Sequence, residues 1–308
     1  AEIARRENLG MSGKFLAKSI AYEIDLRWRI LEAEAASPRL RELLAKVNQG
    51  DQLETDRATL QRWLEKRWIA NSGAISAMCW AIVSRDGTQQ ARVPELVNGR
   101  RAPSLGRNYR RRDYFHGGGR DLTDEEIANP SDLEPLPGKD VYISAVFEGS
   151  NTNTLMVTFS VPIWSGQPDA PNREKIGVLC APVELGAFSL GEHALLADTR
   201  MDQLNQKAGL ILHHPRLGQR GGEDTLYYLA EDDLGLARSL DASDSGDMHL
   251  VESFYDPVAK VSRLVAMEPV MVQGRTQAKD TGWVIVVVDE QSDGDAQASS
   301  PSSNIPRG

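Results

Sequence analysis

The sequence predicts an α+β fold in which one long amino-terminal helix precedes two modules with antiparallel sheets. Three observations predict it. The first 50 residues have a helical pattern, the strand signals after residue 73 do not alternate with helices, and a shorter version of the same order begins after residue 191. The predicted organisation is a helix over residues 1–50, a first module over 51–190, a second module over 191–290 and a disordered linker over 291–308.

Length and composition indicate a folded globular chain. Its 308 residues suffice for two domains of ordinary size, and its 41% hydrophobic and 26% charged residues lie near the averages for such proteins. The net charge of −9 disfavours general binding of nucleic acid, because a phosphate backbone would be repelled. The longest apolar runs, Ala77 to Val83 and Trp283 to Val288, have the length of a strand and fall far short of the roughly 20 residues that cross a bilayer.

The amino-terminal helix is predicted from apolar residues that recur at helical spacing over residues 2–47. Ser37-Pro38 is expected to break it, because proline disfavours helical geometry in the preceding residue and begins helices well. Gly10 and Gly13 are also expected to fray or break it. Residues 14–36 alone would extend about 35 Å, longer than most globular cores need, so the sequence predicts a spine or stalk.

The first module is predicted to begin with a second helix, over about residues 55–69, and a β-hairpin. Asp86-Gly87 is a strong turn signal between an apolar strand over 74–83 and a strand over 88–93. The next segment is rich in glycine, proline, arginine and aspartate, and we expect a loop with short helices there. That loop covers residues 98–140, and further strands are predicted over 141–147, 155–163 and 176–185.

The second module is predicted to repeat this order in a shorter form. We expect a helix near residues 198–207 and then a strand over 209–213. An irregular acidic and glycine-rich stretch follows to residue 247, and strands over 261–269 and 282–289 complete the module. The final 18 residues hold almost no apolar side chains, which is why a disordered linker is expected there.

Several runs of the sequence carry a resemblance to a known family. Those of the first module are Asn108-Tyr109-Arg110-Arg111-Arg112-Asp113-Tyr114-Phe115, Val141-Tyr142-Ile143-Ser144, residues 155–162 and Ile176-Gly177-Val178-Leu179. Those of the second are residues 209–215 and 281–286. In this order behind a long helix, they resemble the double Cache family, the tandem PAS-like (PDC) extracytoplasmic sensor domains of bacterial transmembrane receptors. The resemblance covers roughly residues 10–290.

The resemblance implies a spine helix that runs up from one membrane span, a membrane-distal module, a membrane-proximal module and a linker into a second span. Both spans would be absent from this chain. It also implies a cytoplasmic output, for which we expect a protein kinase, and a homodimer in the intact receptor. The distal module of such receptors usually holds a small ligand between its sheet and the loop before the third strand. The chain would then be a sensor fragment and not an enzyme.

The candidate ligand site is the arginine-rich loop of the first module. Between residues 98 and 120 there are seven arginines against one acid, in a chain whose net charge is negative. A guanidinium group offers a planar fork of donors that suits a carboxylate or a phosphate, and aromatic residues could supply apolar walls. The candidate ligand-binding residues are Tyr109, Arg110, Arg112, Asp113, Tyr114, Phe115, Tyr142 and Ser144. A small carboxylate would fit; alternatively, arginines of this loop, chiefly Arg100, Arg101 and Arg120, pair with the acidic run over 121–126.

The resemblance also bears on the charge of the ligand. Amino-acid-sensing members of the family have an Arg-x-aromatic-aromatic run, a tyrosine followed two residues later by an aspartate, and an aspartate on the last strand. Arg112-Asp113-Tyr114-Phe115 and Tyr142 match this pattern, but Ser144 and Pro182 stand where the acids would be. The amine of a ligand would lack a counter-charge. We therefore expect an anion without an amine, or a site that binds nothing, unless Asp113 faces the pocket.

Other chemistry has little support in the sequence. No zinc-protease, phosphate-loop, dinucleotide or nucleophile-elbow motif occurs, so no cofactor, metal site or catalytic residue is predicted. His213 and His214 are neighbours on a predicted strand and point to opposite faces, which disfavours a shared metal. Cys79 and Cys180 are expected to be free thiols, although a disulfide between the two strands is conceivable. The alternative to a sensor is a ligand-free module that dimerises through the long helix.

Overall fold

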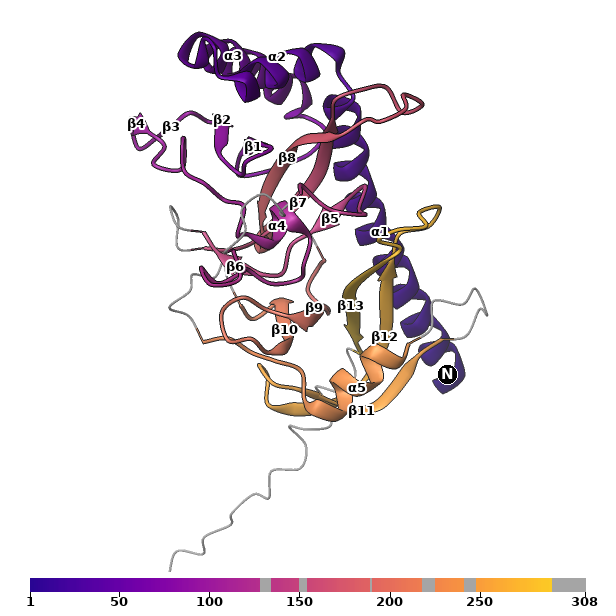
Figure 1. Cartoon of the computed structure of the whole chain (residues 1–308). Coiled ribbons are helices and arrows are strands. Elements are labelled where there is room, and N and C mark those ends of the chain that lie inside the picture. The colour runs from indigo at the N-terminus through magenta and orange to yellow at the C-terminus, as the bar shows by residue number, and fades with distance from the viewer. Residues whose placement is uncertain (128–133, 150–153, 189, 218–224, 241–247, 290–308) are drawn as a thin grey trace, which may run out of the picture.

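Two antiparallel sheets lie one beyond the other along a single long helix in the computed structural model (Figure 1). The structure describes residues 1–127, 134–149, 154–188, 190–217, 225–240 and 248–289. The linker predicted over 291–308 lies outside these ranges. None of the helices in the described ranges is both long enough and apolar enough to cross a membrane.

Helix α1 (Glu2–Ala35) is unbroken and packs against both sheets, as the predicted spine requires (Figure 1). The break predicted at Ser37-Pro38 is confirmed, because α2 (Pro38–Gln49) begins there, and the Ser37 hydroxyl accepts a hydrogen bond from the amide of Leu40. Helix α3 (Leu53–Asn71) confirms the second predicted helix and packs on α2 and on the first sheet.

The break predicted at Gly10 and Gly13 is wrong, because both glycines lie inside α1. They face the second sheet at close range. A Cβ atom on Gly10 would lie 2.3 Å from Sδ of Met248, and one on Gly13 would lie 3.1 Å from Cβ of Ala266. The two glycines therefore allow the helix to approach the sheet more closely than larger residues would, and this contact offsets their low helix propensity.

The first sheet has the strand order β2-β1-β8-β7-β5, with the short strand β6 also paired to β7. The hairpin turn predicted at Asp86-Gly87 is confirmed, since Gly87 has a φ of +88° and β1 pairs with β2 across it. The first strand begins six residues later than predicted, and the strand predicted over 141–147 is split in two. The elements of this module are β1 (Trp80–Ser84), β2 (Gln89–Val93), β3 (Leu96–Val97), β4 (Arg100–Arg101), α4 (Asp113–His116), β5 (Tyr142–Ile143), β6 (Phe147–Glu148), β7 (Leu155–Trp164) and β8 (Lys175–Glu184).

The second sheet has the order β10-β9-β13-β12-β11. Counted along the chain without the short strand β6 and the separate β3–β4 pair, both sheets read second, first, fifth, fourth, third strand, so the shorter second version expected from the sequence has the same strand order. The elements are β9 (Ala194–Met201), β10 (Ala208–His213), α5 (Glu231–Ser239), β11 (Leu250–Asp256), β12 (Val261–Met271) and β13 (Asp280–Val288). A short 3₁₀ turn, η2 (Leu185–Ala187), precedes β9.

The helix predicted over 198–207 is wrong. This segment contains the end of β9, which pairs with β13 on one side and with β10 on the other. Residues 198–201 belong to β9, and residues 202–207 form the turn into β10, where the Asp202 carboxylate accepts from the amides of Leu204 and Asn205. Helix α5 and strand β11 were not predicted and lie in or just beyond the stretch expected to be irregular.

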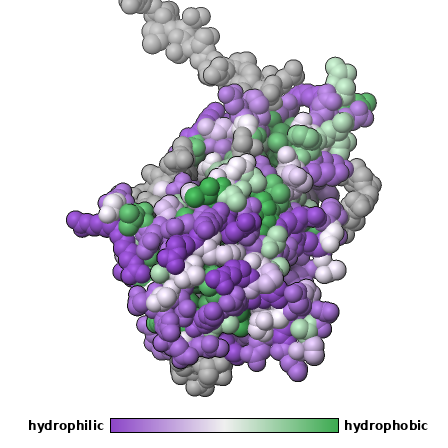
Figure 2. Space-filling view, turned by 90° about the horizontal axis from the view of Figure 1, so that it is seen from above, coloured by the Kyte–Doolittle hydropathy of each residue, from purple (hydrophilic) through white to green (hydrophobic). Residues whose placement is uncertain are grey.

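The core at the junction of the two sheets is built around α1. Trp28 of α1 packs edge-on against Phe159 of β7, with ring centroids 6.1 Å apart, and Phe188 packs edge-on against Trp283 of β13 at 5.2 Å. One continuous cluster of buried side chains includes α1 and both sheets. The face seen from above in Figure 2 is mostly hydrophilic, with small hydrophobic areas between polar ones.

Candidate functional site

The predicted site residues lie on α4, on β5, in the segment just before α4 and in the residues just after β5 (Figure 1). Arg112 immediately precedes α4, so its backbone is extended while the next three residues turn into the helix. Tyr142 begins β5 and pairs with Ser160 of β7. The short helix and the short strand thus bring residues 112–115 to within hydrogen-bonding reach of the main chain that follows Tyr142.

Arg112 is held by an acid and two aromatic rings. Its Nη1 donates to Oδ2 of Asp121 at 2.6 Å, and its guanidinium carbon lies 4.8 Å from the ring centroid of Phe147 and 5.9 Å from that of Tyr114. Burial lowers the pKa of Arg112, but the charge and hydrogen bond of Asp121, with the nearby Tyr114 and Asp113, together raise it overall. The site therefore holds a permanent cation already paired with a carboxylate of the same chain.

Asp121 connects this cation to the second module. Its Oδ1 accepts a hydrogen bond from the backbone amide of Asp113 at 3.0 Å, so one carboxylate binds both Arg112 and the start of α4. The backbone amide of Asp121 donates to Oε1 of Gln203 at 3.0 Å, and the amide of Gln203 donates to the carbonyl of Val146 at 2.8 Å. Because Gln203 lies in the turn between β9 and β10, the loop that carries Asp121 bridges the two modules.

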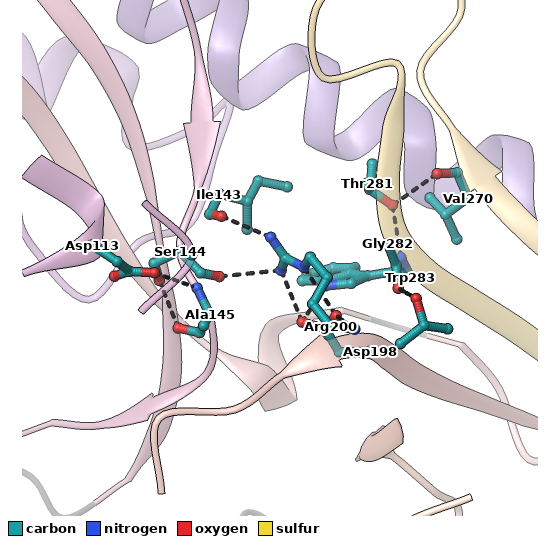
Figure 3. Close-up of polar contacts among 12 residues, drawn as sticks. Asp113, Ile143, Ser144, Ala145, Asp198, Arg200, Val270, Thr281, Gly282 and Trp283 are labelled. Carbon is teal, nitrogen blue, oxygen red and sulfur yellow. Dashed lines mark hydrogen bonds and ion pairs between the residues drawn. The ribbon is translucent and has the colours of Figure 1, made fainter. Parts of the chain in front are cut away.

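Asp113 points toward the main chain after β5 (Figure 3). Its Oδ2 accepts from the amide of Ala145 at 2.7 Å and from the hydroxyl of Tyr142 at 3.3 Å. Burial raises its pKa to about 6, against the effect of the Ala145 hydrogen bond, since the carboxyl group is only 1% exposed. The Asp113 carboxylate is thus engaged by the protein itself.

Tyr142 and Ser144 are engaged in the same way. The Tyr142 hydroxyl accepts from the amide of Gly119 at 3.0 Å, and burial together with the nearby Asp113 charge raises its pKa. The Ser144 hydroxyl is fully buried, accepts from the amide of Thr158 at 2.8 Å and donates to the carbonyl of Ala145 at 2.9 Å. Ser144 therefore satisfies main-chain groups between β5 and β7.

The space between the first sheet and its loop is filled by apolar side chains. The buried members of this cluster are Ala81, Val83, Tyr114, Phe115, Leu136, Val178 and Cys180, with Tyr109 and Tyr142 packed against them. Burial raises the pKa of Tyr114 well above its usual value. The structure thus brings Arg112, Asp113, Tyr114 and Tyr142 together, and it places Tyr109 and Phe115 in the apolar wall beside them.

Arg110 lies apart from this group. Its backbone amide donates to Oδ1 of Asn108, and a Cβ atom on Gly87 would lie 2.4 Å from its own Cβ, so it packs against the β1–β2 turn. The alternative in which the loop's arginines pair with the acidic run over 121–126 is seen for Arg120, which donates to Glu126 at 2.9 Å, and for Arg112, whose partner Asp121 begins that run. Arg101 instead pairs with Glu95 at 3.7 Å.

Arg200 of β9 was not predicted, yet it joins the two modules (Figure 3). It donates to the carbonyls of Ile143 and Ser144 at 2.8 and 3.2 Å, and to both carboxylate oxygens of Asp198 at 3.0 and 2.8 Å. Burial lowers the pKa of Arg200, but the charge and hydrogen bonds of Asp198, with the nearby Tyr142 and Asp113, together raise it overall. The sequence signal for this residue was an Asp-x-Arg pair, whose side chains lie on the same face of a strand. It was missed because a helix was predicted over 198–207.

The cysteines and histidines have no arrangement for catalysis or metal binding. Cys79 and Cys180 are free and buried, and burial raises the pKa of Cys180 to about 12. His214 lies 3.1 Å from Oδ2 of Asp256 in a buried pair. Within the ranges that the structure describes, no three histidine, cysteine, aspartate or glutamate side chains gather into a metal site.

Two sheets of one strand order on a shared helix, with a loop site over the first, define the fold class of this chain: it is the fold of solved ligand-binding domains of chemoreceptors and of a histidine kinase sensor domain. Searches with the sequence add no relative, since no family model matches it and no curated protein matches it. The likeness lies in the solved structures.

Three solved structures of sensor domains show the likeness. The ligand-binding domain of the Pseudomonas aeruginosa amino acid chemoreceptor PctC in complex with GABA has a TM-score of 0.51 at 18% identity, over 92% of this chain and 98% of its own. That of the Pseudomonas fluorescens chemoreceptor CtaA with L-isoleucine has a TM-score of 0.54 at 14% identity, over 96% of each chain. The sensor domain of the V. cholerae histidine kinase DctB has a TM-score of 0.52 at 14% identity, over 93% and 97%. Identities this low show a shared fold.

Proposed function

We propose that this chain is the extracytoplasmic ligand-binding part of a transmembrane signalling receptor, with the first module distal to the membrane. The fold supports this, since the neighbours named above are sensor domains of two chemoreceptors and a histidine kinase. A protein kinase as the output remains our prediction. The chain itself would bind and transmit, without catalysis.

We further propose that the first module recognises a small carboxylate through Arg112. The observation that carries this is that Arg112 and the amide of Asp113 already hold a carboxylate, that of Asp121, at 2.6 and 3.0 Å. A planar carboxylate bound by a guanidinium group and a backbone amide is a strong charge-assisted arrangement. A ligand carboxylate of the same geometry would take the place of the Asp121 side chain, and Tyr109, Tyr114 and Phe115 would supply its apolar wall.

This exchange would give the receptor a signal. When a ligand displaces Asp121 from Arg112, the loop that donates to Gln203 loses its anchor in the first module. The contact between the two modules would then favour a different arrangement, and the ligand could shift that equilibrium only by its difference in affinity for the two states. An amine on the ligand would gain nothing from Asp113, because that carboxylate faces Ala145 and Tyr142.

The test is a thermal-shift screen of residues 1–308 against small carboxylates, amines, amino acids and phosphates, in which a bound ligand raises the melting temperature. One carboxylate is expected to stabilise the wild type and lose its effect in Arg112→Ala. Asp121→Asn is expected to bind it more tightly, because the internal competitor has lost its charge. Arg120→Ala is the matched control: its partner is Glu126, so binding should stay as in the wild type. Equal binding by the wild type and Arg112→Ala would overturn the proposal.

A second function has its own support: dimerisation through α1. Four large apolar side chains on the outward side of this helix are exposed, at 66–74% of their surface: Ile3, Met11, Phe15 and Tyr22. The apolar filling of the first module also favours a module without a ligand. Sedimentation of the wild type and of a Phe15→Glu, Tyr22→Glu double variant tests it. A concentration-dependent dimer that the variant abolishes is expected, and a monomer at all concentrations would contradict it.

A further inference from the structure

A cavity of about 440 Å³ lies at the junction of α1, the first sheet and the β12–β13 hairpin. Trp28 of α1 forms one side of it, Ile143 of β5 another and Thr281 of β13 a third. Figure 3 shows Arg200 between Ile143 and Thr281, with Asp113 on the far side of β5. The volume is that of a site for a small organic molecule. Tyr142 also lines the cavity, which therefore adjoins the candidate site, although Arg112 itself is not among the lining residues.

Arg200 offers a fixed donor to this cavity. A guanidinium group has five N–H donors, and four of those of Arg200 are used by Asp198 and by the carbonyls of Ile143 and Ser144. The fifth, on Nη1, has no partner among the described residues, and the side chain is 31% exposed. Because the other four bonds hold the group in place, a ligand would meet a donor that needs no further ordering.

Lys139 supplies the positive charge that Arg200, paired with Asp198, does not. Its ammonium group lies 5.7 Å from the ring centroid of Tyr142. Its stem packs on Gly117, where a Cβ atom would lie 2.7 Å from Cδ of Lys139. In the part of the chain that the structure describes, no acidic side chain forms an ion pair with it. The cavity wall therefore carries one cation without a counter-ion.

The remaining wall is apolar at the bottom and acidic at the rim. The indole N–H of Trp28 donates to the carbonyl of Tyr142 at 3.2 Å, so the part of this side chain that lines the cavity is apolar. Val141 and Ala278 add to that surface. Asp280 is exposed at the rim, where its Oδ1 accepts from the amide of Gly282 at 2.8 Å, and its charge would repel a second carboxylate on a ligand.

The main chain around the cavity is held in an unusual conformation. Gly138 and Ala278 both line it and have φ angles of +64° and +54°. A side-chain-bearing residue such as alanine rarely adopts a positive φ, and outliers of this kind gather at ligand sites.

We propose that this cavity is a second ligand site and that it binds a small monocarboxylate with an apolar body. The carboxylate would lie between Lys139 and the free N–H of Arg200, and the apolar body would lie against Trp28 and Ile143. Such a ligand touches α1 and both sheets at once, so it would favour one arrangement of the junction over others. The inference does not depend on ligand binding at Arg112.

The experiment is calorimetric titration of residues 1–308 with sodium hexanoate, with hexylammonium and adipate as probes of charge. Hexanoate is expected to bind the wild type and Arg112→Ala with affinities within twofold of each other. Lys139→Gln should weaken binding at least tenfold, and Lys139→Arg should restore most of it. Adipate should bind more weakly than hexanoate, and hexylammonium should not bind. Lys139 is half-buried at the surface, so the melting temperature of each variant checks that it is folded.

Three outcomes would overturn the proposal. They are no hexanoate binding to the wild type at millimolar concentration, equal binding by Lys139→Gln, and binding that survives Lys139→Gln but is lost in Arg112→Ala. The last result would place hexanoate at the Arg112 site, so it would support the proposed function while it removes the second site. Binding lost in Lys139→Gln but kept in Arg112→Ala supports the second site alone.

Discussion

The two modules share one strand order and differ in the segment between their second and third strands. In the first module this segment carries α4 and the arginine-rich loop, and in the second it carries α5, whose first turn is acidic. Each segment places a buried aspartate against the main chain at the third strand: Asp113 accepts from Ala145 at 2.7 Å, and Asp233 accepts from Tyr255 at 3.1 Å. Asp113 therefore has a structural role found in both modules, the acceptance of a backbone N–H at the third strand. The Arg112–Asp121 pair is particular to the first module.

The largest loss of unfolding free energy is expected for two core variants, which test whether the two modules unfold as one cooperative unit. Phe159 of β7 and Phe254 of β11 are both fully buried, one in each sheet. Replacing either by alanine should cost about 3–5 kcal/mol of unfolding free energy. Phe159 belongs to the buried cluster that includes α1 and both sheets, and Phe254 belongs to a second cluster within the second module. Because strands β9, β12 and β13 contribute side chains to both clusters, each variant should lower the same cooperative transition in calorimetry and urea titration.

A matched exposed position provides the control for these variants. Leu96 of β3 is 58% exposed, so Leu96→Ala should leave the transition nearly unchanged. Two resolved transitions, with Phe159→Ala lowering only one of them and Phe254→Ala only the other, would contradict a single unit and separate the modules energetically.

The next effect compares two buried aspartates whose pKa values move in opposite directions. Burial raises the pKa of Asp113 to about 6, above the usual 3.8, so the folded state binds its proton more tightly and stability should rise as pH falls from about 6 to 4. A change of that size corresponds to roughly 3 kcal/mol. Burial also acts to raise the pKa of Asp256, but the His214 hydrogen bond and two backbone amides lower it overall, so its contribution is lost as pH falls below about 4.

Melting temperatures measured from pH 3 to 7.5 test both predicted pH dependences, the one from Asp113 and the one from Asp256. Asp113→Asn should remove the gain between pH 6 and 4, and Asp256→Asn should remove part of the loss at the acid end. A wild type and an Asp113→Asn variant whose melting temperatures run parallel across pH 4–6 would show that the Asp113 carboxyl group is not perturbed.

A smaller change in stability is expected when glycine is replaced by alanine on β8 or β13, the strand of each sheet that comes last along the chain. A Cβ atom on Gly177 of β8 would lie 2.4 Å from the carbonyl oxygen of Val83, a rigid neighbour, so Gly177→Ala should cost about 1–3 kcal/mol. Gly282 of β13 has a φ of +75°, and Gly282→Ala should cost about 1–2 kcal/mol and displace Arg200. Gly235 of α5 has open space around it, and Gly235→Ala should stabilise by up to about 1 kcal/mol. A neutral Gly177→Ala would contradict the close approach of β8 to β1.

The smallest effect compares one exposed ion pair on each module. Arg85 pairs with Glu174 at 2.6 Å in the first, and Arg6 of α1 pairs with Glu252 at 2.6 Å in the second. All four side chains are at least a third exposed, and exposed pairs contribute little because water screens them. Arg85→Ala and Arg6→Ala should each shift the melting temperature by no more than about 1 °C. A larger loss in either would show that the pair belongs to a wider network.

The fold could be predicted where local pattern and tertiary pairing agree. The strand predicted over 155–163, the turn at Asp86-Gly87 and the proline at the start of α2 all match their final structures. The prediction was wrong over 198–207, because residues 198–201 end a strand whose neighbour β13 lies far away in the sequence, and residues 202–207 form a turn. The helix break predicted at Gly10 and Gly13 was wrong for a related reason, since the helix sequence does not indicate the sheet that these glycines approach.

The site could be predicted only in part, for the same physical reason. Arg112, Asp113 and Tyr142 were expected together and do lie together, and pairing of the loop's arginines with acids just beyond them was foreseen as an alternative. Arg200 was not, because it meets the carbonyl of Ile143 across 57 residues of sequence, and a bond to a backbone carbonyl leaves no pattern in either segment.

The pairing of Arg5 in α1 with Asp289, just after β13, has one more consequence. It places the start of the helix beside the end of the last strand, so both ends of the folded unit emerge at the same place. Since α1 is unbroken, an axial displacement of the helix against β13 is not absorbed along its length. A displacement of one residue, about 1.5 Å, would appear in full as an offset between the two ends of the unit.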